Sequence, residues 1–63
     1  MYLLTDEPKG SGALAVAFRV LDDAFGTEEF DYGSAIGALD NSEVPNPEDT
    51  FDRLVSAGSI SEV

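Results

Sequence analysis

The chain has 63 residues and carries 13 Asp and Glu against three Lys and Arg, a net charge of −10 at pH 7. So short a chain forms one domain, placed over residues 1–63, and has little core to spare, because small domains bury only about 60% of the surface that the unfolded chain exposes. Because Cys and His are both absent, disulfides, thiolate metal sites and the commonest general base are excluded.

The sequence predicts no contact with a membrane. Its longest apolar run, residues 13–18, is far shorter than the roughly 20 residues that span a bilayer. Residues 1–12 lack the basic start and apolar run of a secretion signal. We therefore expect the protein in the cytoplasm.

The first two elements are predicted from apolar spacing. Residues 1–4 form an apolar run too short for a stable helix, which predicts a strand. The segment between Ser11, a candidate N-cap, and Gly26, a suitable terminator, predicts a helix. The apolar positions that follow three-four spacing are Leu14, Ala17, Phe18, Leu21 and Phe25. Further apolar residues widen this stripe past half the circumference, so we expect a central helix that is touched from two sides; they are Ala13, Val16, Val20 and Ala24.

Residues 32–39 predict a second, shorter helix. Asp31 is a suitable N-cap, and Phe30 before it can pack on Ala35 as a hydrophobic staple. Gly33 and Gly37 weaken this helix by roughly 0.5–1 kcal/mol each relative to Ala. Their small size permits close approach of another helix, either within the fold or from a second copy.

The sequence Asn46-Pro47-Glu48-Asp49 indicates the start of a third helix, with Asn46 as cap and acids near the positive end of the helix dipole. The residues expected to face inward are Thr50, Phe51, Leu54 and Val55. Gly58 ends the helix, and residues 59–63 form a strand that can pair with residues 1–4. The predicted fold is mainly α, in the order β-α-α-α-β.

The spacing of Leu54, Gly58 and Ile60 resembles the end of a winged-helix or helix-turn-helix domain, where the third helix closes and turns into the first strand of the wing. The resemblance implies a three-helix fold and a DNA-associated regulator, with Arg19 and Arg53 as the candidate contacts. Two features depart from that family. The third helix begins with acids where the family carries basic or amide side chains, and the sequence stops where the return strand of a wing would begin. Three basic residues cannot make the six to ten phosphate contacts of a strong binder, so nucleic acid is disfavoured as the partner.

The composition resembles proteins of salt-accumulating archaea, because acids are abundant, Lys9 is the sole lysine and small aliphatic residues are frequent. Repulsion among so many carboxylates destabilises the compact state at low ionic strength, and concentrated salt screens it. The alternative is an acidic protein from an ordinary cell.

The acidic residues do not form a pattern for chemistry. The acids of residues 22–31, which include the cluster at 28–31, lack the order of ligands that a calcium loop needs around its central glycine. We therefore expect only loosely bound hydrated cations at high salt, and no metal site or cofactor. The serines have no histidine to activate them, so we predict no catalytic residues.

The predicted function is a non-catalytic module that contacts a protein or a second copy of itself; the helix-turn-helix regulator and a chain without a discrete ligand stay open. The candidate contact residues are Tyr2, Phe30, Tyr32, Gly33 and Gly37.

Overall fold

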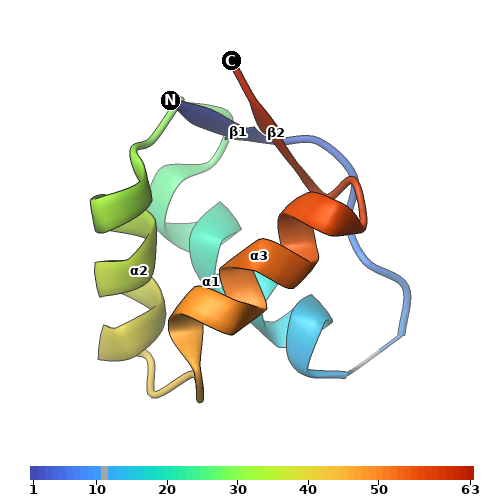
Figure 1. Cartoon of the computed structure of the whole chain (residues 1–63), viewed down its shortest axis with the longest axis vertical. Coiled ribbons are helices and arrows are strands. Elements are labelled where there is room, and N and C mark those ends of the chain that lie inside the picture. The colour runs from blue at the N-terminus through green and yellow to red at the C-terminus, as the bar shows by residue number, and fades with distance from the viewer. Residues whose placement is uncertain (11) are drawn as a thin grey trace.

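The computed structural model describes residues 1–10 and 12–63, and its elements follow the predicted order β-α-α-α-β (Figure 1). The strands are β1 (Tyr2–Leu4) and β2 (Ile60–Glu62), and the helices are α1 (Ala13–Phe25), α2 (Tyr32–Asn41) and α3 (Pro47–Ser56). Each helix packs against the other two, while β1 contacts α1 and β2 contacts α3. The mainly helical fold class is therefore confirmed.

The two strands form an antiparallel pair that joins the ends of the chain. Leu3 lies opposite Ser61, and the amide of Val63 donates a hydrogen bond of 2.9 Å to the carbonyl oxygen of Met1. On the other side of β1, Tyr2 exchanges two backbone hydrogen bonds with Phe30, of 2.7 and 2.9 Å. β1 is thus held on both edges, and the predicted pairing of the terminal strands is confirmed.

Helix α1 contacts both α2 and α3, as expected of a helix touched from two sides, but most of the residues expected to widen its apolar stripe are exposed. Ala17 and Leu21 are fully buried, whereas Val16 is 47% exposed and Val20 is half-buried. Ala13 and Ala24 are also exposed. The reason is topological: both remaining helices pack on the Ala17 and Leu21 side, and none of the elements formed by residues 1–10 and 12–63 covers the side that carries Val16. The candidate cap Ser11 lies outside the described residues, and Gly12 takes the N-cap position.

Helix α2 begins as the sequence predicts. The side chain of Asp31 accepts a hydrogen bond of 3.1 Å from the amide of Ser34, which satisfies one of the unpaired donors of the first turn. Phe30 and Ala35 both lie in the core, as expected of a hydrophobic staple. The helix continues two residues past its predicted end, to Asn41.

Helix α3 begins at Pro47, and Asn46 stands at the N-cap position, but its side chain makes no capping hydrogen bond. The backbone of Asn46 is left-handed, with φ of 49°. The hydroxyl of Thr50 instead donates to the carbonyl oxygen of Pro45 at 3.1 Å. At the other end Gly58 has φ of 83° and terminates the helix, as predicted.

One hydrophobic core lies between the three helices and the strand pair. Phe51 and Leu54 enter it from α3, as expected. Val55 does not, because it is 37% exposed, which corrects its expected inward position. The buried members of the core are Ala17, Phe18, Leu21, Phe30, Ala35, Leu39, Val44, Phe51, Leu54 and Ile60.

Candidate functional site

The charged side chains all lie on the surface. Every one of the 13 Asp and Glu residues is exposed, as are Lys9, Arg19 and Arg53. Within residues 1–10 and 12–63, no group of three or more acids is placed so that it could hold a metal ion. The acids therefore form a dispersed negative surface rather than a site.

Both arginines face carboxylates of their own chain. The Nε of Arg53 lies 2.9 Å from Oδ2 of Asp49, one turn earlier in α3. The Nε of Arg19 lies 3.8 Å from Oε2 of Glu7, rather than pairing with the acids that follow it in α1. All four side chains are about 60–70% exposed, so each pair contributes at most about 1 kcal/mol.

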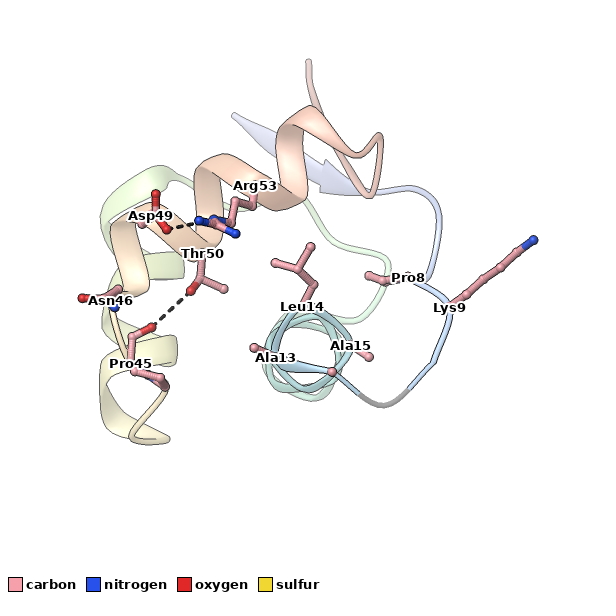
Figure 2. A pocket seen from close by; sticks show the side chains of 11 residues that line it. Pro8, Lys9, Ala13, Leu14, Ala15, Pro45, Asn46, Asp49, Thr50 and Arg53 are labelled. Atoms are coloured by element: carbon pink, nitrogen blue, oxygen red, sulfur yellow. Dashed lines mark hydrogen bonds and ion pairs between the residues drawn. The ribbon is translucent and has the colours of Figure 1, made fainter.

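The two arginines also line separate hollows. Figure 2 shows the first, of about 470 Å³, between the first turns of α1 and α3, with Leu14 beside Arg53 and Lys9 extending away from it. Asp49 lies in the same hollow and offsets the charge of Arg53. Arg19 belongs to the second hollow, on the outer face of α1. Arg19 and Arg53 therefore line different hollows, and each faces a carboxylate of its own chain.

An aromatic cluster joins β1, α2 and α3. The ring of Phe51 is buried and meets Tyr2 edge-on, with centroids 5.0 Å apart. The same ring meets Tyr32 edge-on at 5.1 Å. Edge-to-face contacts at these distances are the favourable geometry for aromatic pairs. Two of the three aromatic residues predicted as contacts thus converge on a common core ring.

The third predicted aromatic, Phe30, is only 2% exposed and belongs to the core. Its ring stacks on Phe25 at 4.8 Å, and its backbone is bound to Tyr2. Phe30 therefore cannot meet a partner from the folded domain, and its predicted contact role is wrong. The predicted staple to Ala35 already indicates an inward position for this ring, whereas the bridge to Tyr2 is a long-range contact that local sequence patterns do not reveal.

The two glycines of α2 are exposed, and they do not serve as a close-packing face within the fold. A Cβ placed on Gly33 or on Gly37 would meet nothing within 4 Å. Among the described residues, no other helix of this chain therefore approaches Gly33 or Gly37 closely, although their small size allows it. Core packing of α2 uses Ala35 and Leu39 instead.

Tyr32 is the aromatic residue most open to a partner, with 39% of its surface exposed. Partial desolvation raises the pKa of its phenol, and the charges of Glu48 and Asp52 raise it further. Glu48, Asp52 and Val55 lie at successive turns on one face of α3. We call Tyr32 and these three residues the Tyr32 surface. Sequence reasoning missed the exposed position of Val55, because a residue one helical turn after the buried Phe51 is expected to face the core as well.

No protein-family model, curated protein or solved structure matches this chain. The resemblance to winged-helix domains therefore stays a prediction from the sequence. None of the helices formed by the described residues is both long enough and apolar enough to cross a membrane.

Proposed function

We propose that this chain is a non-catalytic module that binds a partner protein through the Tyr32 surface. The observation that carries the proposal is the position of Tyr32, which stands on the core ring of Phe51 at 5.1 Å and keeps 39% of its surface exposed. A half-exposed ring held by the core offers a large contact area and loses little conformational freedom on binding. Val55 adds exposed apolar surface one turn beyond Phe51.

The charges beside Tyr32 favour a basic partner. Glu48 and Asp52 lie close enough to raise the pKa of its phenol, and Asp31 precedes it directly. A surface with an apolar centre and an acidic rim complements a segment that presents Lys or Arg around an apolar side chain. The same acids repel nucleic acid, since phosphate binding rests on Lys and Arg.

The non-catalytic part of this proposal is supported by the positions of the carboxylates. General acid and base work needs a carboxyl whose pKa is shifted by an apolar pocket, and all 13 acids here are exposed. With no histidine in the sequence, the serine hydroxyls also lack their usual activating base.

We further propose that the module works in the cytoplasm of a salt-accumulating cell. A net charge of −10 on 63 residues, all of it at the surface, destabilises the compact state unless counterions screen it. At about 1 M salt the screening length falls to about 3 Å, which removes most of this repulsion.

A photo-crosslinking amino acid placed at Val55 tests the proposed contact in cells that express the chain. We expect one discrete adduct at Val55, none at the exposed loop position Thr27, loss of the adduct with Tyr32→Ser and its retention with Tyr32→Phe, which keeps the ring. Circular dichroism checks that each variant is folded. Equal adducts at Val55 and Thr27, or an adduct indifferent to Tyr32→Ser, would overturn the proposal.

A further inference from the structure

The outer face of α1 is a second apolar surface, distinct from the Tyr32 surface. Val16, Val20 and Ala24 follow one another at steps of four residues and form a single ridge along the helix. Val16 is 47% exposed, Val20 is half-buried and Ala24 is exposed. The described part of the chain provides no element that covers this ridge.

A hollow of about 460 Å³ lies on this face, lined by Val16, Val20, Arg19, Asp23 and Ser42. Arg19 and Asp23 are its two charged residues, so the formal charges of the lining cancel, although the whole chain carries −10. An apolar ridge within a locally neutral surface is therefore a part of this protein that a second, equally acidic copy can approach with little local repulsion.

We propose that the outer face of α1 binds a second copy of the chain, with the two α1 helices antiparallel and a twofold axis at Val20. Val16 and Ala24 each lie four residues from Val20, about 6 Å along the helix. The axis then sets Val20 against Val20 of the second copy and Val16 against Ala24 of the second copy. A large side chain then faces a small one on both sides of the centre, so the surface is complementary to itself, as a twofold interface requires.

The charges of this face agree with the same axis. Arg19 and Asp23 lie on the same flank of the ridge, one residue before and three residues after Val20. In the antiparallel arrangement Arg19 therefore comes within about 3 Å, along the helix direction, of Asp23 of the second copy. Helical side chains lean toward the N-terminus, which directs Arg19 to that carboxylate. The symmetry forms the pair twice.

Two interactions oppose the dimer. Arg19 already faces Glu7 at 3.8 Å, but both side chains are about 60% exposed, so that pair is weak and exchanges readily. The larger opposition is repulsion between two chains of −10 each. Concentrated salt screens this long-range term and does not weaken the apolar contact of the ridges. The dimer is therefore expected in concentrated salt and disfavoured in dilute buffer.

Sedimentation equilibrium in about 2 M KCl, the screened regime, tests the proposal across a range of protein concentrations. The wild-type mass is expected to rise from 6.7 kDa to twice that value. Arg19→Asp and Asp23→Arg should each weaken association by about tenfold, since each replaces attraction by repulsion across the axis. The double variant Arg19→Asp/Asp23→Arg should restore association. Both positions are exposed, so these variants are expected to fold, which circular dichroism checks.

Asp23→Arg separates a specific pair from general charge effects. It changes the net charge from −10 to −8, because one negative charge becomes positive, whereas the double variant stays at −10. Tighter association of Asp23→Arg, a double variant as weak as the single ones, or a wild-type chain that stays at 6.7 kDa would each overturn the proposal. The Val55 adduct is expected to survive all three substitutions, so the dimer and the Tyr32 surface can fail separately.

Discussion

The backbone amide of Val44 donates a hydrogen bond of 3.0 Å to the carbonyl oxygen of Leu39, and both side chains are buried. Between them, the amide of Glu43 donates to the carbonyl oxygen of Asp40, also at 3.0 Å. These two bonds are the pair that closes a helix in the Schellman motif, with a hydrophobic contact across it. The residue that must be left-handed in this motif is Glu43, with φ of 61°.

Glu43→Gly is therefore expected to raise the free energy of unfolding by roughly 0.5–1 kcal/mol, because glycine adopts the left-handed conformation without the Cβ clash. Urea denaturation in about 2 M KCl measures the change. Glu43→Ala is the matched control, since it removes the same carboxylate and keeps a Cβ. Equal effects of the two substitutions would mean that charge, and not backbone strain, is responsible.

Leu21→Ala should reduce the free energy of unfolding by about 2–5 kcal/mol, since Leu21 is fully buried and its truncation leaves a cavity. That loss is large for so small a domain. Val16→Ala, on the exposed side of the same helix, should change it by less than about 0.5 kcal/mol. Both are measured by denaturation at protein concentrations low enough to keep the chain monomeric. A comparable loss for Val16→Ala would show that this side of α1 is covered after all.

The Asp31 cap predicts a specific loss of stability in acid. Hydrogen bonds from the side chain and the amide of Ser34 hold the pKa of Asp31 below its usual 3.8 in the folded state. The unfolded chain therefore binds this proton more tightly. The stabilisation is complete above the unfolded pKa and is lost as the pH falls through the folded pKa.

Asp31→Asn isolates this effect, because asparagine also caps helices but does not titrate. The urea midpoints of the wild type and the variant, compared from about pH 6 to about pH 2, should converge as the acid is added. A difference between them that is independent of pH would contradict a titrating cap at Asp31.

Stability should rise with KCl well past physiological concentration. Thirteen exposed carboxylates repel one another, and salt shortens the range of this repulsion. The melting temperature is expected to climb steadily between about 0.1 and 2 M KCl and to fall on dialysis into dilute buffer. A melting temperature indifferent to KCl would argue for an acidic protein of an ordinary cell. NaCl at equal strength is the matched control for simple screening.

Local sequence signals correctly predicted most of the helix ends. The capping carboxylate of Asp31 and the left-handed glycine Gly58 act within a few residues, so their effects can be inferred without tertiary structure. The end of α2 could not be inferred, because Glu43 carries no preference for the left-handed conformation. It takes that conformation because the Val44 side chain is drawn into the core next to Leu39.

By itself, the sequence determined the class of each element, their order and the presence of a dense negative charge, because these follow from spacing, caps and composition. Only the tertiary structure decided which apolar faces are covered. Phe30 is buried where its backbone bonds to Tyr2, a residue distant from it in the sequence. Val16 is exposed because both other helices pack on the opposite side of α1. Helical spacing shows that a face is apolar, whereas burial depends on whether so short a chain has another element left to cover it.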